Sequence, residues 1–405
     1  MGKYIKDNNP YTLQFSYIPP RFIERYEITH EIIGNYTQKV PAYRGIFLTG
    51  VRGSGKTVML GDIRNRIASR DDWVTIDLNP ESNLLDSLAR ILYREQRVKH
   101  LFLKANIDLS VFGIGVSVEK NELLSANEED ALRMMLQILK KNGKKLLVTI
   151  DEVTYSKDVA MFSHALSSFA SQNLDVFVLM TGLKENIDNI KNKKSLTFLY
   201  RAKVYLLEVL NPMAISFDYN EIFDISVEQA RTLAGITRGY SLAFQALGYH
   251  LWNIKCEQKG DEGLIPYDSL NERLDLTLSE MSYEKIWSEL SEKDIEILIA
   301  LERLMIENGK DIIRVEDVRK NTGMTSDSFT KYRKRLIDAG ILNGKVYGYL
   351  KFNLPRFEEY VKNREEFRNL TSFNTEDFQL MMGYRELSRA KQKRLMAYLE
   401  ELKKM

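Results

Sequence analysis

The octapeptide GVRGSGKT at residues 50–57 matches the phosphate-binding pattern G-x-x-x-x-G-K-[ST] at every fixed position. The apolar run at 45–49 is typical of a buried strand, and residues 58–68 carry apolar side chains at helical spacing without a proline. Strand, loop and helix thus follow in the order that phosphate binding needs, because a helix N-terminus directs backbone N–H groups at an anion. We therefore predict a P-loop rather than a glycine-rich turn that binds nothing.

The side chains of this loop have distinct expected tasks. Lys56 can reach the β- and γ-phosphate oxygens, and the Thr57 hydroxyl can bind Mg²⁺, while the glycines let backbone N–H groups converge on the phosphates. ATP or ADP with Mg²⁺ is therefore the expected ligand. The loop residues predicted to bind it are Gly50, Arg52, Gly53, Ser54, Gly55, Lys56, Thr57 and Val58.

A second motif, KLLVTIDE at residues 145–152, is an apolar run that ends in two adjacent carboxylates, as a Walker B strand does. The carboxyl end of a buried parallel strand lies at the sheet edge where ligands bind. Asp151 is predicted to hold Mg²⁺, and Glu152 to orient and polarise the attacking water. The alternative is a strand that merely runs into a polar loop. The paired carboxylates favour hydrolysis over nucleotide storage.

Two further apolar runs, 73–78 and 175–180, complete a pattern of short strands alternating with helices, which predicts a doubly wound parallel sheet. Thr181 directly follows the second run. A polar side chain there can sense the γ-phosphate or hold the water, but threonine is also common at strand ends without a function. The sequence favours the first interpretation slightly.

These motifs, together with LTFLYRAKVYLLEVL at residues 196–210, resemble AAA+ ATPases of the archaeal-ATPase and origin-initiator type, which overlap with STAND regulators. The chain is also similar to bacterial ATP-binding proteins that carry a TGVRGSGKT loop, as at residues 49–57 here. The resemblance covers most of the chain. It implies an α/β fold with a P-loop NTPase sheet of the ASCE type, a small helical lid and a C-terminal winged helix.

The resemblance also implies tasks for single residues. Thr181 would take the sensor 1 role. Arg201 stands where many AAA+ proteins place an arginine finger, which would act on a neighbouring subunit in a homo-oligomer; a salt-bridge arginine is the alternative. The segment at residues 18–25, with Ile23, would flank the adenine or form a rigid packed linker.

The lid departs from the AAA+ pattern. Leu242 occupies the place of the usual sensor 2 arginine, and Ser241 replaces the proline of STAND lids. Arg238 is near but out of register, so it is given no catalytic role. The expected coupling between nucleotide and lid is therefore weaker or different.

The domain boundaries follow from changes in pattern along the 405 residues. A possible inserted hairpin at residues 109–119 has no predicted task. The predicted parts are an N-terminal segment (1–44), the ATPase core (45–210), a helical lid (211–258), a linker and connecting helix (259–290), a winged helix (291–362) and a helical tail (363–405).

The expected winged helix carries a local excess of basic residues. Between residues 326 and 356 there are seven basic and two acidic residues, a difference of +5 in a chain whose net charge is +2. The recognition helix is expected over residues 326–339, and residues 341–352 are expected to form a glycine-containing hairpin. The predicted nucleic-acid contacts are Lys331, Lys334, Arg335 and Lys345.

Composition excludes several classes of protein. One cysteine, Cys256, rules out an internal disulfide and fits a reducing cytosol, and four scattered histidines offer no zinc site. No apolar run reaches the length of a membrane span, so we expect a cytoplasmic protein.

The leading hypothesis is an ATP-hydrolysing AAA+ protein whose nucleotide state controls binding of double-stranded DNA. The alternative is a STAND-like switch in which the winged helix contacts protein. A small-molecule kinase is disfavoured, because the sequence shows no compact lid with an acceptor pocket.

Overall fold

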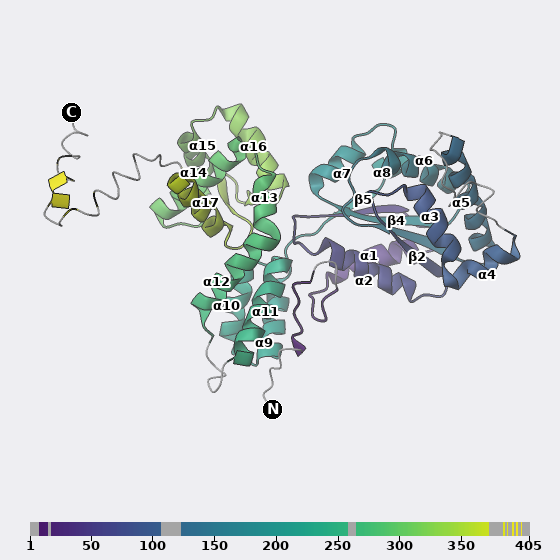
Figure 1. Cartoon of the computed structure of the whole chain (residues 1–405), viewed down its shortest axis with the longest axis horizontal. Helices are drawn as coiled ribbons and strands as arrows, with labels where there is room; N and C mark the ends of the chain where they lie inside the picture. Colours follow the sequence, from purple (N-terminus) through teal and green to yellow (C-terminus); the bar gives the residue numbers. More distant parts are fainter. Residues whose placement is uncertain are drawn as a thin grey trace.

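The computed structural model describes residues 8–14, 18–106, 123–257 and 265–371, with isolated positions from 384 onward. Two lobes are visible in Figure 1, an α/β lobe on the right and a helical lobe on the left. The predicted hairpin at 109–119, and the tail beyond residue 371 apart from those isolated positions, lie outside the described residues.

The α/β lobe is built on a five-stranded sheet of order β2-β3-β4-β1-β5 in which every described pair of neighbours is parallel. Parallel strands with helices between them are what the sequence predicted. The strands are β1 (Gly45–Thr49), β2 (Trp73–Leu78), β3 (Lys145–Ile150), β4 (Val176–Gly182) and β5 (Lys203–Leu206).

The strands are apolar throughout because both faces of the sheet are covered. In β1 the side chains of Ile46 and Leu48 enter one core and that of Phe47 enters the other, as the two-residue period of a strand requires. Residues at β1 and β4 thus divide between two apolar layers, which fixes the register of the central strands.

One face of the sheet is covered by α1 (Tyr26–Thr37) and α2 (Lys56–Ala68), whose buried side chains share a core with Ile46 and Leu48. The other face carries the remaining helices of this lobe, as Figure 1 shows. These are α3 (Leu84–Arg94), α4 (Gln96–Lys104), α5 (Leu123–Lys141), α6 (Lys157–Ser171), α7 (Lys184–Lys191) and α8 (Thr197–Tyr200).

The helical lobe begins with the lid, which follows β5 directly. It contains α9 (Pro212–Phe223), α10 (Val227–Thr237) and α11 (Ser241–Glu257). We also count α12 (Tyr267–Leu278) in the lid, because it packs in the same apolar core, although the sequence assigned it to the linker and connecting helix. A π-helical turn, η3 (Ser279–Tyr283), and the short α13 (Glu284–Ser288) then lead out of the lid. We call residues 279–290 the connector, because they join the lid to the winged helix.

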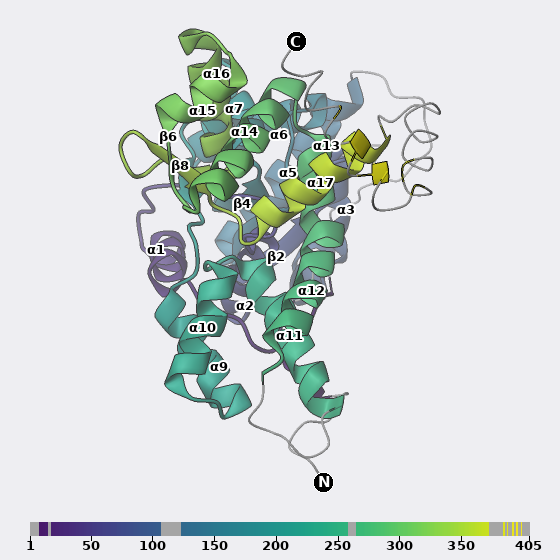
Figure 2. The ribbon, with the colours of Figure 1, turned by 90° about the vertical axis from the view of Figure 1, so that its left-hand side faces the viewer.

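The winged helix follows the connector and lies above the lid in Figure 2. Its three-stranded sheet has the order β6-β8-β7, with antiparallel pairs. Its elements are α14 (Glu292–Asn308), β6 (Ile313–Arg314), α15 (Val315–Thr322), α16 (Ser326–Asp338), β7 (Leu342–Asn343), β8 (Tyr349–Phe352) and α17 (Phe357–Thr371).

Ser291 caps α14 through a reciprocal bond with Asp294, and α16 is capped by Thr325, whose hydroxyl accepts from the Ser328 N–H. The fold class predicted from the sequence is confirmed: a P-loop-type parallel sheet is followed by a helical region with a small antiparallel sheet.

The lid and the winged helix share one apolar core that runs from Leu210 to Val361. Two ion pairs cross between them: Arg238 of the lid pairs with Glu358, and Arg356 pairs with Asp275 of α12. Both arginines have a positive φ. Continuous packing with cross-links on two sides makes the lid and winged helix a single packed unit.

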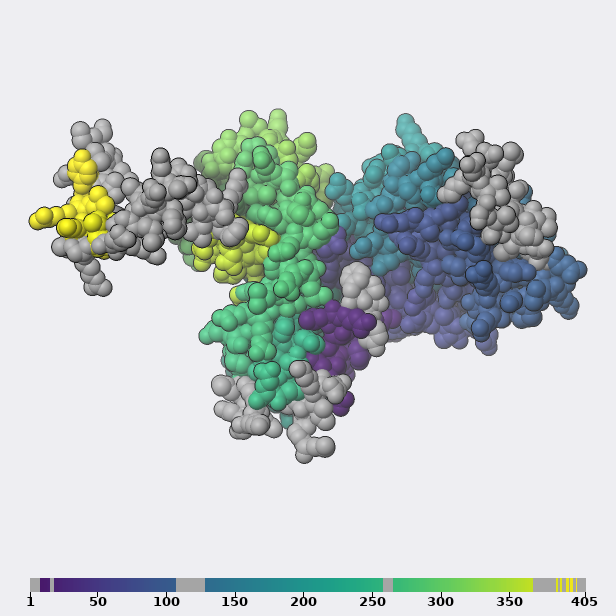
Figure 3. Space-filling view, viewed as in Figure 1, coloured from purple at the N-terminus to yellow at the C-terminus, as the bar shows by residue number. Residues whose placement is uncertain are grey.

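Residues 8–14 and 18–25, which we call the strap, lie against the lid and are visible as the purple segment beside it in Figure 3. Tyr11 is 1% exposed among lid side chains, and its hydroxyl bonds to Asp218 at 2.5 Å. Gln245 of α11 accepts from the Thr12 N–H and donates to the Arg21 carbonyl. The strap therefore belongs to the lid core although it precedes the sheet in the chain.

Within the described residues, no helix combines the length and the apolar character that a membrane crossing needs.

Candidate active site

The predicted P-loop links the end of β1 to the start of α2, and its backbone has the shape that phosphate binding needs. Gly53 and Gly55 have φ of 75° and 87°, the left-handed region that glycine tolerates. At Gly53 a Cβ would also lie 2.2 Å from the Tyr240 hydroxyl. Glycine is therefore required at this position for two independent reasons.

Lys56 is 9% exposed, and its ammonium donates to the carbonyls of Gly50 at 3.1 Å and Val51 at 2.9 Å. Burial lowers the pKa of Lys56 to about 8, against the opposing effect of the carboxylates of Glu152 and Asp151. A buried ammonium whose hydrogen-bond acceptors are neutral carbonyls suits an anionic ligand, so this site fits a phosphate group.

The residues predicted to hold Mg²⁺ lie together. The Thr57 hydroxyl donates to Asp151 Oδ2 at 2.8 Å, and the Thr181 hydroxyl donates to Asp151 Oδ1. A carboxylate and a hydroxyl in contact beside a P-loop are oxygen donors of the kind that Mg²⁺ prefers. The donor set therefore fits the ion that the sequence implies.

Glu152 has an unusual backbone that Thr181 helps to hold. Its φ is 54°, and its N–H donates to the Thr181 hydroxyl at 2.9 Å. Thr181 is fully buried, so one side chain orients both acidic residues of the motif. The Glu152 carboxylate is 56% exposed and lies 3.9 Å from the guanidinium of Arg52. It can reach a water molecule at the open end of the site.

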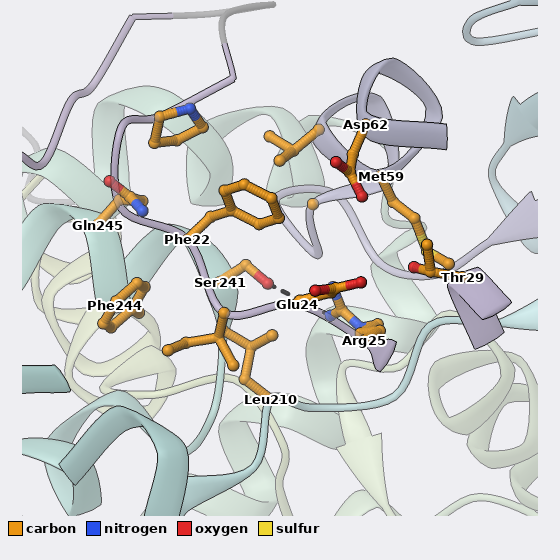
Figure 4. Close-up of a pocket in the computed structure, with 14 residues that line it drawn as sticks. Phe22, Glu24, Arg25, Thr29, Met59, Asp62, Leu210, Ser241, Phe244 and Gln245 are labelled. Carbon is orange, nitrogen blue, oxygen red and sulfur yellow. Dashed lines mark hydrogen bonds between the residues drawn. The ribbon is translucent and has the colours of Figure 1, made fainter. Parts of the chain in front are cut away.

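A pocket lies beside the P-loop, between the strap, α2 and the lid (Figure 4). Ile23 and Val58, both predicted to bind the nucleotide, line it with Phe22, Met59 and Phe244. Apolar walls next to a phosphate-binding loop fit a planar base.

The lid contacts the P-loop directly through hydrogen bonds to two carbonyls of the loop. The Leu242 N–H donates to the Gly53 carbonyl at 3.1 Å, and the Ser241 hydroxyl donates to the Ser54 carbonyl at 2.9 Å. Where the AAA+ pattern has an arginine side chain, this chain has a backbone hydrogen bond from Leu242 to the P-loop.

Arg25, in the segment at 18–25, had no predicted task, and the structure brings it to the P-loop. Its guanidinium donates to the carbonyls of Ser54 at 2.9 Å and Glu208 at 3.0 Å. Burial lowers the pKa of Arg25 to about 10. No local signal marks Arg25, because the segment also carries Arg21 and Glu24 and the partners of Arg25 are distant in the chain.

Arg201 is exposed just after α8 and is not among the residues that line the pocket. The part of the chain that the structure describes holds no carboxylate paired with it. Its position leaves the prediction of an arginine finger open to test.

The basic residues of the winged helix fall into two groups. Lys331 and Lys334 are exposed on α16, and Lys345 is 77% exposed near the tip of the wing. Arg335, by contrast, pairs with Asp294, which is 0% exposed, and donates to the Ser291 hydroxyl at 2.9 Å. The guanidinium of Arg335 is therefore committed to the winged helix itself.

The winged helix touches the α/β lobe close to the P-loop. A Cβ on Gly340 would lie 2.1 Å from Val51 Cγ1, Asp338 lies 3.6 Å from Lys184, and Lys345 lies 3.7 Å from Glu208. These contacts bring the end of α16 and the wing to the edge of the predicted nucleotide site.

A family model described as a domain of unknown function (DUF8462) matches residues 280–361, which run from η3 into α17. No curated protein sequence matches the chain.

Solved structures that resemble this chain include two ORC proteins and a Cdc6 protein. The Aeropyrum pernix ORC2 protein, solved as ADPNP–ADP complexes, has a TM-score of 0.58 and 13% identity over 88% of this chain and 98% of that chain. Pyrobaculum aerophilum Cdc6p has a TM-score of 0.45 and 14% identity over 87% and 97%. The Aeropyrum pernix ORC1 protein in complex with DNA has a TM-score of 0.39 and 11% identity over 88% and 96%. The predicted resemblance to AAA+ initiator ATPases is confirmed at the level of the fold.

Proposed function

We propose that this chain binds and hydrolyses ATP with Mg²⁺ and couples its nucleotide state to binding of duplex DNA through the winged helix. The observation that carries the proposal is the meeting of Lys56, Thr57, Asp151, Glu152 and Thr181 at one edge of the parallel sheet. The ORC2 protein of similar fold was solved as ADPNP–ADP complexes, which supports nucleotide binding by this chain.

The roles of these residues follow from their chemistry. The Lys56 ammonium binds phosphate oxygens, and Thr57 with Asp151 would hold Mg²⁺, which neutralises charge on the β- and γ-phosphates when it is bound. Glu152 accepts a hydrogen bond from the attacking water and so orients it. Thr181 positions Asp151 through its hydroxyl and Glu152 through its backbone.

Exposed Lys331 and Lys334 support the DNA half of the proposal, because both side chains are accessible to phosphate oxygens from solvent; the Lys331 ammonium also lies 5.7 Å from the centre of the Tyr332 ring. The net charge of residues 326–356 is smaller than the sequence count suggested, once their ion pairs with other segments are included. Arg335 and Arg356 are paired with Asp294 and Asp275, which lie outside residues 326–356, so the balance there falls from +5 to +3 when the two carboxylates are counted.

A second candidate is a STAND-like switch in which the winged helix contacts protein. The observation in its favour is that the end of α16 and the wing already contact the α/β lobe through Asp338, Gly340 and Lys345. A surface that binds protein within the chain can also bind another protein.

One experiment separates the two candidates. ATP hydrolysis is measured with Mg²⁺, with and without duplex DNA, and DNA binding is titrated at several salt concentrations. We expect hydrolysis that depends on Mg²⁺, and DNA affinity whose logarithm falls linearly with the logarithm of salt concentration. Hydrolysis without DNA binding at moderate salt would favour the switch, and no nucleotide binding at all would refute the ATPase proposal.

A further inference from the structure

Arg52, the third residue of the P-loop, places one guanidinium between two carboxylates of different origin. Its Nη1 lies 3.9 Å from Glu152 Oε1, and its Nη2 lies 3.5 Å from Glu289 Oε1. Glu152 belongs to the predicted hydrolytic site, whereas Glu289 directly follows α13 in the connector to the winged helix. A single side chain thus joins the site to the connector.

The main chain of Arg52 is held from the same side. Its carbonyl accepts from the Tyr240 hydroxyl at 2.6 Å, and that hydroxyl lies 2.9 Å from the Ser282 hydroxyl in η3. The side chain is 26% exposed, and its Nε is buried without a hydrogen-bond partner. The backbone of Arg52 is therefore fixed while its guanidinium retains an unused donor.

The position of Arg52 points to the γ-phosphate. The water that Glu152 would orient attacks that phosphate, so a guanidinium beside Glu152 is within reach of the transferred group. Arginine binds phosphate oxygens through two parallel N–H donors, and such bonds are shorter and stronger than the two long contacts that Arg52 makes here. A γ-phosphate would therefore outcompete an exposed carboxylate.

We propose that Arg52 recognises the γ-phosphate from within its own chain, and that Glu289 of the connector competes with that phosphate for the guanidinium. The inference rests on the proposed nucleotide site and adds to it the residue that distinguishes ATP from ADP. ADP lacks the competing group, so Arg52 keeps its contact with the connector in the ADP state and leaves it in the ATP state.

Glu289 has a second partner, which lowers the free-energy cost of losing its contact with Arg52. Lys285, one turn earlier in α13, lies 3.5 Å from the same carboxylate oxygen. When Arg52 moves to the phosphate, Glu289 keeps an ion pair within the connector. The exchange therefore does not leave an unpaired charge on either side.

The test is the ratio of affinities for a non-hydrolysable ATP analogue and for ADP, measured with Mg²⁺ by calorimetry. In Glu289→Gln the analogue should bind up to about fivefold more tightly, the range for loss of one exposed ion pair, while ADP affinity is unchanged. Glu284→Gln is the matched control: it removes the same charge from the same connector, but Glu284 pairs with Arg364, at 3.2 Å. It should leave both affinities as they are.

Arg52→Ala, alone and combined with Glu289→Gln, completes a double-mutant cycle. It should weaken the analogue and not ADP, and Glu289→Gln should have no further effect in its presence, since the two changes act on one interaction. Hydrogen exchange of residues 279–290 should be faster with the analogue than with ADP in the parent, and equal in Arg52→Ala.

Three outcomes would overturn the inference. These are an equal gain for both nucleotides in Glu289→Gln, the same gain in the Glu284→Gln control, and additive effects in the double variant. Each of them assumes that the parent binds nucleotide. Absence of nucleotide binding in the parent would instead refute the proposed function on which the inference rests.

Discussion

At the scale of single residues, the site is defined by contacts between side chains that are close in space and separated in sequence. Thr57, Asp151 and Thr181 come from three different segments and meet in two hydrogen bonds. Parallel strands whose carboxyl ends share one edge bring this about, so substitutions here should change chemistry before they change folding.

Glu152→Gln should keep nucleotide and Mg²⁺ bound while slowing hydrolysis by about 10²- to 10⁴-fold, because an amide preserves the shape of the carboxylate but is a poor base. Nucleotide affinity and single-turnover hydrolysis are the two measurements. Asp151→Asn is the comparison, because it should instead weaken the Mg²⁺-dependent part of binding. Hydrolysis at the parental rate in Glu152→Gln would show that another residue orients the water.

The lowered pKa of Lys56, about 8, predicts how nucleotide affinity depends on pH. Bound phosphate favours the ammonium, so binding above pH 8 must take up a proton. Affinity should be flat below that pH and fall by up to about tenfold per unit above it. The nucleotide phosphates are already ionised in this range, since their second pKa is near 6.

The same shift has a consequence for folding. The pKa of Lys56 is lower in the folded chain than its ordinary value of 10.5, so burial of the charged form costs stability below pH 8. That cost diminishes as the pH rises from 8 toward 10.5.

Calorimetry of ADP binding in two buffers of different ionisation heat measures the proton uptake on nucleotide binding, and Lys56→Arg, which stays charged, should show none. Zero uptake by the parent at pH 8.5 would contradict the assigned pKa.

At the scale of elements, α16 shows what one helix face can and cannot reveal. The spacing of Lys331, Lys334 and Arg335 predicted three outward cations, but Arg335 reaches the buried Asp294 of α14. Helical periodicity places a residue on a face, whereas its partner depends on how two helices cross. The two lysines should therefore behave as surface charges and the arginine as part of the packing.

We expect Lys331→Ala with Lys334→Ala to weaken DNA binding and to flatten its salt dependence by about one unit for each phosphate-binding lysine removed. Their effect on the free energy of unfolding should stay within about 0.5 kcal/mol, as for other surface substitutions. Binding is titrated at several salt concentrations, and stability by urea. Unchanged DNA binding would identify this face as ordinary solvated surface.

Arg335→Ala should instead destabilise the winged helix by about 1–3 kcal/mol, because it leaves the carboxylate of Asp294 buried with only Ser291 as a partner. The value is below the usual range for a buried pair because Arg335 is itself 46% exposed. Urea unfolding measures it, and a loss no larger than that of the lysine pair would contradict the assignment.

The sequence predicted the elements well and the contacts between them only in part. β1, β3 and the loop between β1 and α2 were predictable because their motifs are local and their apolar pattern is continuous. The tasks of Arg25 and Tyr240 were not, since each depends on a partner brought close by the lid or the strap. Leu242 was recognised as an exception, but its backbone bond to Gly53 is a property of the docked lid.

At the scale of the whole molecule, the winged helix lies against the P-loop at a point where a side chain would not fit. Gly340 has φ of 73°, and a Cβ there would lie 2.1 Å from Val51 Cγ1. Gly340→Ala should therefore displace the winged helix from the loop, in addition to the strain of about 1 kcal/mol that a left-handed alanine carries.

Gly348→Ala is the matched control for this change. Gly348 has φ of 78°, and a Cβ there would meet no other atom within 4 Å, so the substitution introduces the strain without the clash. Hydrogen exchange at residues 50–55 should rise in Gly340→Ala and stay at the parental level in Gly348→Ala. Val51→Ala, which removes the opposing methyl groups, should restore protection. Equal exchange in both glycine variants would show that the contact does not hold the two lobes together.

The strap can form its contacts with the lid only late in the synthesis of the chain. Tyr11 is bonded to Asp218, 207 residues later, and Thr12 to Gln245, 233 residues later. A ribosome that adds about 5–20 residues each second needs about 10–50 s to cover that distance. During this interval the sheet can be completed, whereas the lid residues that bind Tyr11 have not yet been synthesised. The wall of the pocket that the strap provides is then the last part of the site to form, so the newborn α/β lobe is expected to meet nucleotide before it can enclose the base.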